Sequence, residues 1–147
     1  MERALHIVVL DRSSVGEDVS VEPLKKYGEV TFHMTTKDEE AAERVKDADI
    51  IIVNKTPMNA DTLDGASHLK LICEFATGFD NVDLDYCRKR GIPVVNVVNY
   101  STAAVAQHTI ACVLYILEKL RYYDDYVSPG LMGHSEIFPF RSALLRA

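Results

Sequence analysis

Three polar segments each follow a short apolar run, and their residue types suit the binding of an anion. Asn54-Lys55-Thr56-Pro57 carries a compact positive charge, Ala76 to Asn81 carries the Thr77 hydroxyl beside Gly78, and Asn99-Tyr100-Ser101-Thr102 adds hydroxyl groups. A glycine accepts positive φ without strain and leaves neighbouring backbone N–H groups open to an anion. A single glycine after a strand is usually an ordinary turn, so the hypothesis of a small-carboxylate site depends on the three segments meeting.

The elements that would position these segments alternate along the chain. Apolar, β-branched runs predict strands at residues 5–10, 30–32, 49–53, 69–75 and 92–97, and helical patterns predict helices at 19–27, 36–45, 59–66 and 83–90. Gly28 is expected to end the first helix, and a capping box from Thr36 to Glu39 to begin the second. The pattern predicts an α/β fold: a flavodoxin-like three-layer sandwich around a five-stranded parallel sheet. Ligands of such sheets bind beyond the carboxyl ends of the strands, where the polar segments lie.

A long helix is predicted after the sheet. Residues 101 to about 123 contain no Gly or Pro, and the stretch from Ala103 to Leu117 is apolar nearly all round. A helix that is apolar on every side needs partners on every side. The expected organisation is a sandwich domain over residues 1–100, a linking helix over 101–125 and an irregular tail over 126–147.

Composition narrows the classes of partner. Sixteen basic and twenty-two acidic residues give a net charge of −6, which disfavours nucleic acid and anionic membrane surfaces. The longest apolar run, Ile110 to Leu117, would span only about 12 Å as a helix, against about 30 Å of hydrocarbon. No secretory leader pattern opens the chain, so a cytoplasmic location is expected. The three cysteines form no C-x-x-C pair, and no metal site is expected from them.

Several segments occur in an order that is specific to one family. They are LIC followed by ATGFDNVD (71–73 and 76–83), RGIPVVNV (90–97) and YSTAAVAQHT (100–109). Together they resemble the D-isomer-specific 2-hydroxyacid dehydrogenases, most closely the glycerate dehydrogenase/hydroxypyruvate reductase branch. The resemblance runs from about Leu5 to about Tyr126.

The resemblance implies a function and a set of site residues. In that family a flavodoxin-like substrate-binding lobe packs against a Rossmann NAD lobe, and a linking helix contributes to a dimer contact. The resemblance implies that the backbone N–H groups of Gly78 and Phe79 bind the carboxylate of a small 2-hydroxy or 2-oxo acid. It further implies that Asn54 and Lys55 line the same pocket. The residues implied to face the nicotinamide end of NAD are Thr77 and Val105.

The 147 residues also depart from the family pattern. No G-x-G-x-x-G occurs, so the Rossmann NAD lobe is expected to be absent. Counterparts of the family's catalytic Arg, Glu and His are not found, because Arg141 and Arg146 match no family motif. His108 is expected to be a packed, hydrogen-bonded residue of the buried long helix, and His134 is expected in a loop. Neither is assigned a catalytic role. No catalytic residue is therefore predicted. This chain alone is expected to bind NAD weakly or not at all and to show no NADH-dependent turnover.

Three hypotheses follow. The first is a truncated substrate-binding lobe of an NAD-dependent D-2-hydroxyacid dehydrogenase, inactive alone. The second is a non-catalytic module that binds a small carboxylate or dimerises. The third is a receiver-type signalling domain using Asp11, which is weakened because Asn54 stands where a phospho-accepting aspartate is needed. A homodimer is expected from the apolar long helix, and exchange of helix 101–125 between protomers is one way to form it.

Overall fold

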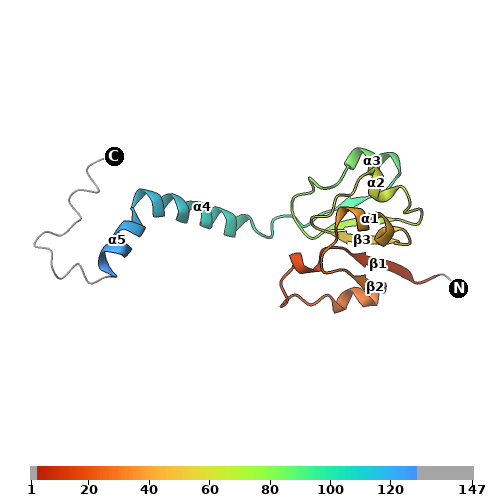
Figure 1. Ribbon diagram of the computed structural model, residues 1–147, viewed down its shortest axis with the longest axis horizontal. Helices are drawn as coiled ribbons and strands as arrows, with labels where there is room; N and C mark the ends of the chain where they lie inside the picture. Colours follow the sequence, from red (N-terminus) through yellow and green to blue (C-terminus); the bar gives the residue numbers. More distant parts are fainter. Residues whose placement is uncertain (1–2, 129–147) are drawn as a thin grey trace, which may run out of the picture. The chain divides into compact units, whose positions relative to one another are not determined.

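The computed structural model describes residues 3–128, and the chain divides into one unit up to Asn99 and a second from Tyr100 (Figure 1). The first unit is built on five parallel strands in the order β2-β1-β3-β4-β5. They are β1 (Leu5–Val9), β2 (Gly28–Phe32), β3 (Ile50–Val53), β4 (Leu71–Glu74) and β5 (Val94–Val95). This is the flavodoxin-like order, so the predicted sheet is confirmed.

Three helices cover one face of this sheet: α1 (Asp38–Val45), α2 (Ala60–Leu63) and α3 (Leu84–Lys89) (Figure 1). The core between them and the sheet includes Val8, Ile51, Ile72, Val45, Leu63 and Cys87. On the opposite face Ile7, Val9 and Ile52 are buried, with Leu24 packed against them. Leu24 belongs to the 3-10 helix η2 (Glu22–Lys26), and a second 3-10 turn, η1 (Arg12–Ser14), follows β1. The third layer of the sandwich is therefore thin in the part of the chain that is described.

The helix predicted at residues 19–27 is wrong in type and extent. Only η2 forms, with Pro23 in its first turn, and it gives way directly to β2. Gly28 is the first residue of β2 and pairs with Leu5. A Cβ at Gly28 would lie 2.1 Å from the Leu5 carbonyl oxygen, so this glycine permits a close strand approach and does not cap a helix.

The predicted capping box is displaced by one residue. Lys37 is the N-cap of α1, and its backbone N–H donates to the Glu40 carboxylate at 3.2 Å. The Thr36 hydroxyl, expected to cap the helix, donates to the Leu10 carbonyl oxygen at 2.7 Å. Thr36 therefore ties the start of the helix segment to the end of β1.

The second unit contains two helices where one was predicted. They are α4 (Thr102–Leu117) and α5 (Leu120–Val127), bent by 63° at Lys119, which has a left-handed backbone with φ 51° and ψ 41°. No Gly or Pro marks this break in the sequence. Residues 126 and 127, expected in an irregular tail, belong to α5, whereas residues 129–147, including His134, lie outside the described part.

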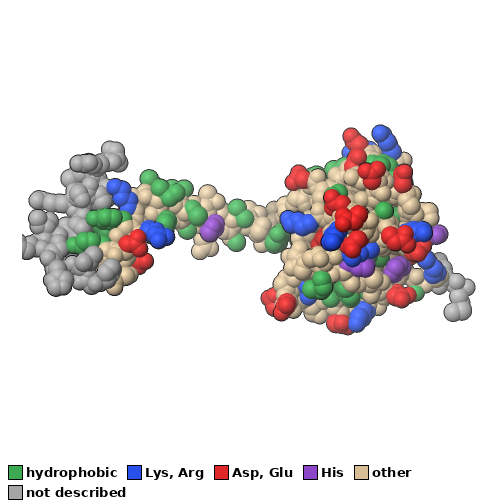
Figure 2. All heavy atoms as spheres, in the orientation of Figure 1, with side chains coloured by type: hydrophobic (Ala, Val, Ile, Leu, Met, Phe, Trp, Pro, Cys, Tyr) green, Lys and Arg blue, Asp and Glu red, His purple; other side chains and the backbone are tan. Residues whose placement is uncertain are grey.

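The side chains of α4 are exposed along its whole length, with apolar groups prominent in Figure 2. The expected burial of this helix, and of His108 on it, is therefore not found within residues 3–128. His108 Nε2 lies 3.5 Å from Cys112 Sγ one turn away. In the same range no single helix is long and apolar enough to cross a membrane, although the bent pair α4 and α5 together meets the length and composition of a span.

Candidate functional site

Two of the three polar segments form a pocket at the carboxyl edge of the sheet. Its volume is about 270 Å³, and its lining residues are Asn54, Lys55, Ala76, Gly78, Asp80 and Asn81. The segment after β3 and the segment after β4 meet there because β3 and β4 are neighbouring parallel strands. The third segment, 99–102, crosses the boundary between the two units, and Asn99 adopts a left-handed φ of 63° at that boundary.

Asp11 holds the first of these loops in place. One carboxylate oxygen accepts the backbone N–H groups of Asn54, Lys55 and Thr56 at 3.0, 2.8 and 3.1 Å, and the other accepts the Thr56 hydroxyl at 2.9 Å. Burial acts to raise the pKa of Asp11, but the hydrogen bonds from the loop outweigh it and hold the pKa below its ordinary value of 3.8. Asp11 is thus a structural carboxylate whose oxygens are engaged, which argues against the signalling hypothesis.

Asn81 joins the second loop to the first. Its side-chain amide donates to the Thr56 carbonyl oxygen at 3.1 Å and to a Glu74 oxygen at 2.9 Å. The Asn81 carbonyl oxygen accepts the backbone N–H of Met58 at 2.8 Å. A further link runs from the Asp83 N–H to the Met58 carbonyl oxygen at 2.9 Å. The two walls of the pocket are therefore fastened to each other as well as to the sheet.

The turn at Gly78 leaves backbone donors unused. The N–H groups of Gly78 and Phe79 have no hydrogen-bond acceptor within residues 3–128, and both residues are exposed. The expectation that Gly78 has positive φ is wrong, since Gly91 is the glycine of the described chain with that conformation. A Cβ at Gly78 would meet just the Asp80 carboxylate, at 3.6 Å. The turn itself therefore does not require a glycine at position 78. The missing side chain instead leaves the backbone at this position uncovered.

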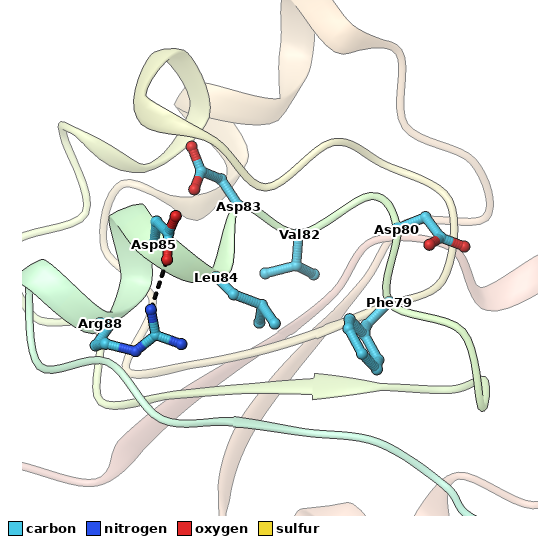
Figure 3. Close-up of a pocket in the computed structure, with 7 residues that line it drawn as sticks. All are labelled: Phe79, Asp80, Val82, Asp83, Leu84, Asp85 and Arg88. Carbon is cyan, nitrogen blue, oxygen red and sulfur yellow. Dashed lines mark hydrogen bonds and ion pairs between the residues drawn. The ribbon is translucent and has the colours of Figure 1, made fainter.

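Phe79 directs its side chain to a neighbouring, larger pocket. Figure 3 shows this pocket of about 410 Å³, lined by Phe79, Asp80, Val82, Asp83, Leu84, Asp85 and Arg88. Its Arg88 is paired with Asp85 at 2.5 Å, and Asp83 caps α3 by accepting the Tyr86 N–H at 2.9 Å. Because its cation is paired and its other charges are carboxylates, this pocket suits an anion less well than the pocket beside Lys55.

Thr77 and Val105 lie elsewhere than in the pocket lining. The Thr77 hydroxyl donates to the Val97 carbonyl oxygen at 2.8 Å, and the Thr77 carbonyl oxygen accepts the Asn96 amide at 2.7 Å. These bonds connect the loop after β4 to the segment after β5. Val105 is exposed on α4, in the second unit. Their roles near a nicotinamide remain predictions.

Sequence reasoning missed two residues of this site. Glu74 and Asn81 were not singled out, although a glutamate at the end of an apolar strand is an unusual sequence feature. Asp11 was considered only as a phosphorylation site, because its hydrogen-bond partners lie 43 to 45 positions away in sequence. Long-range partners of this kind cannot be identified from local pattern.

The helix N-termini are the places at which the phosphates of a dinucleotide would be expected to bind. The helix N-caps, Lys37, Asn59, Asp83, Ser101 and Lys119, include no glycine, so none of these helices begins at a glycine-rich phosphate-binding turn.

The comparison with known families agrees with the fold. The catalytic domain of the D-isomer specific 2-hydroxyacid dehydrogenases matches residues 7–140. The chain therefore belongs to the D-isomer-specific 2-hydroxyacid dehydrogenase family.

Individual relatives give the same result. The chain is 34% identical over 130 residues to a hydroxypyruvate reductase of Blautia hydrogenotrophica, covering 86% of this chain and 40% of the relative. It is 36% identical over 135 residues to a glycerate dehydrogenase of Methylorubrum extorquens, covering 90% and 42%. Among solved structures, D-lactate dehydrogenase from Aquifex aeolicus, complexed with NAD and lactic acid, has 30% identity and a TM-score of 0.72, covering 90% and 39%. The chain thus spans about 40% of the length of each of these three relatives.

Proposed function

We propose that this chain is the substrate-binding domain of an NAD-dependent D-2-hydroxyacid dehydrogenase, and that its pocket holds the carboxylate of a small 2-hydroxy or 2-oxo acid. Lys55 would supply the positive charge, the free N–H groups of Gly78 and Phe79 would donate to the carboxylate oxygens, and Asn54 would complete the wall. The hydride chemistry of the family needs a nicotinamide that the described residues do not cradle, so binding is the role proposed for this part.

One observation carries the proposal: the backbone N–H groups of the exposed residues Gly78 and Phe79 have no acceptor within residues 3–128, and Gly78 lines the same pocket as Lys55. Unpaired backbone donors next to a cation form an anion site without further rearrangement. Partly buried hydrogen bonds hold both loops, so the donors would be positioned before a ligand arrives. Preorganisation of this kind lowers the ordering cost of binding.

The test is a titration of the isotope-labelled 147-residue chain with glyoxylate, followed by amide NMR shifts. We expect the largest shifts at Gly78 and Phe79, and Lys55→Gln should weaken binding about tenfold or more through loss of a charge-assisted contact. Lys46→Gln is the matched control. Lys46 is exposed and lies between α1 and β3, at the amino ends of the strands and not at the carboxyl ends where the pocket lies. Equal weakening by both substitutions, or shifts confined to other loops, would refute the proposed site.

A second candidate role, dimerisation, rests on α4. Ile110, Ile116 and Leu117 are 60%, 73% and 69% exposed, and a helix with a bare apolar surface gains free energy by covering it. The occupant we propose is a second copy of this chain. Exchange of helix 101–125 between protomers would use the left-handed Asn99 as its hinge.

A further inference from the structure

Glu74 is buried at the end of β4 with half of its carboxyl group unsatisfied. The residue is 2% exposed, and its Oε1 atom accepts the Asn81 side-chain amide at 2.9 Å. Its Oε2 atom is buried and has no hydrogen-bond partner among the described residues. A buried carboxyl oxygen without a partner is costly, and the cost is greatest when the group is ionised. The fold alone gives no reason for a glutamate here.

The position of Glu74 connects it to the pocket through a single residue. Asn81 lines the pocket, and its amide bridges Glu74 and the Thr56 carbonyl oxygen. Glu74 therefore supports the residue that fastens the two pocket loops together, although it does not line the pocket itself.

Two charged side chains act on Glu74 from neighbouring elements. Asp11, at the end of β1, contributes a like charge, and Lys55, in the loop after β3, contributes an opposite one. Burial raises the pKa of Glu74 above its ordinary value of 4.5, the Asn81 hydrogen bond and Lys55 act to lower it, and Asp11 reinforces the rise. Asp80 is the remaining charged group of the pocket lining.

We propose that Glu74 is a positioning residue of the pocket, and that an anionic ligand binds at full affinity only while Glu74 is protonated. Ionised Glu74 would place a second carboxylate beside Asp11, behind the loops that must receive an anion. It would also compete with the ligand for Lys55, the cation of the pocket lining. This inference rests on the proposed function, since it concerns the same pocket.

The direction of the pH effect follows from linkage. If the anion binds the protonated form better, its affinity falls as pH rises through the Glu74 pKa, and the bound anion raises that pKa in return. Glu74→Gln preserves an acceptor for the Asn81 amide and cannot ionise. The affinity of Glu74→Gln for the anion should therefore not change as the pH passes through the Glu74 pKa of the wild type. It should be close to the affinity of the wild type at low pH.

The experiment measures the glyoxylate dissociation constant of the full chain by NMR at a series of pH values from about 5 to about 8. We expect the wild-type constant to rise about fivefold or more as the pH rises through the Glu74 pKa, and then to level off. Glu74→Gln should show no such rise. Glu43→Gln, which alters an exposed glutamate of α1, should retain the wild-type profile.

A second measurement covers the case in which the Gln variant does not fold. The carboxyl carbon signal of Glu74 in the wild type should titrate at higher pH with saturating glyoxylate than without it. A flat wild-type profile, an unchanged profile in Glu74→Gln, or a Glu74 midpoint unaffected by glyoxylate would overturn the inference while leaving the proposed function intact. Absence of glyoxylate binding at every pH in every variant would overturn the proposed function, and this inference with it.

Discussion

Asp11 accepts four hydrogen bonds from residues that lie 43 to 45 positions later in the chain. Three of the donors are consecutive backbone N–H groups, and Asp11 is the acceptor found for them among residues 3–128. The loop that carries Lys55 thus depends on one side chain at the end of another strand.

We predict that Asp11→Asn lowers the free energy of unfolding by about 2–4 kcal/mol, because an amide cannot accept all four donors and leaves some of them unpaired. The pKa of Asp11 lies below 3.8, so this stabilisation is complete above that pH and is lost as pH falls through the folded-state pKa. Urea unfolding of both proteins at neutral and acidic pH measures the difference. Asp18→Asn, at an exposed position, is the control. A difference that does not shrink in acid would contradict the assignment.

Gly78 allows stability and binding to be separated. Its φ is not positive and a Cβ there meets one oxygen at 3.6 Å, so Gly78→Ala should leave stability unchanged or raise it by about 0.4–1 kcal/mol. The added methyl group would stand between a ligand and the backbone donors. Loss of one charge-assisted hydrogen bond corresponds to about tenfold weaker glyoxylate binding or more.

Thermal unfolding and NMR titration test this pair of expectations for Gly78. Gly65→Ala, which adds a methyl group in open space away from the pocket lining, should change neither binding nor fold. Loss of stability in Gly78→Ala would instead mean that the glycine is needed for the turn.

At the scale of the element, the sheet was predictable because β-branched runs and the helices between them repeat regularly along the chain. The pocket edge was predictable too, since polar residues directly follow β3 and β4. The η2 segment was not, because its apolar spacing matches an α-helix although Pro23 and the close pairing of Gly28 leave space for just five residues. The break at Lys119 was missed because nothing in the residue type favours a left-handed backbone there.

The break between α4 and α5 gives a prediction whose sign is informative. Lys119→Gly should stabilise the helix pair by roughly 1 kcal/mol, since glycine adopts the left-handed conformation without the cost that other residues incur. If residues 102–127 instead formed one continuous helix, Lys119→Gly would destabilise that helix by a similar amount. Circular dichroism with thermal unfolding distinguishes the two, and Gln107→Gly, inside α4, provides the destabilising reference. Reduced helicity in Lys119→Gly would show that the helices join in solution.

At the scale of the whole molecule, α4 determines the expected assembly. Each fully buried Leu or Ile side chain gains about 1.5–3 kcal/mol, and α4 exposes several of them in the described chain. We predict a homodimer at micromolar concentration, and Leu114→Glu should weaken association about a hundredfold or more by forcing a carboxylate into the contact. Sedimentation velocity measures both, with Gln107→Glu as a control on the same helix. A monomeric wild type, or unchanged association of Leu114→Glu, would exclude α4 as the contact.

The hydrogen bonds from Asp11 to the loop after β3 also have a consequence for the order of folding. β1 and β3 are neighbours in the sheet but are separated by about forty residues of chain, and closing so long a segment is entropically costly and slow. The pocket lined by Lys55 and Gly78 can form only after that closure and after β4 has joined, because Asn81 fastens the second loop to the first. Binding competence would therefore appear late, and during refolding the recovery of ligand binding would mark the moment at which β4 has joined β1 and β3.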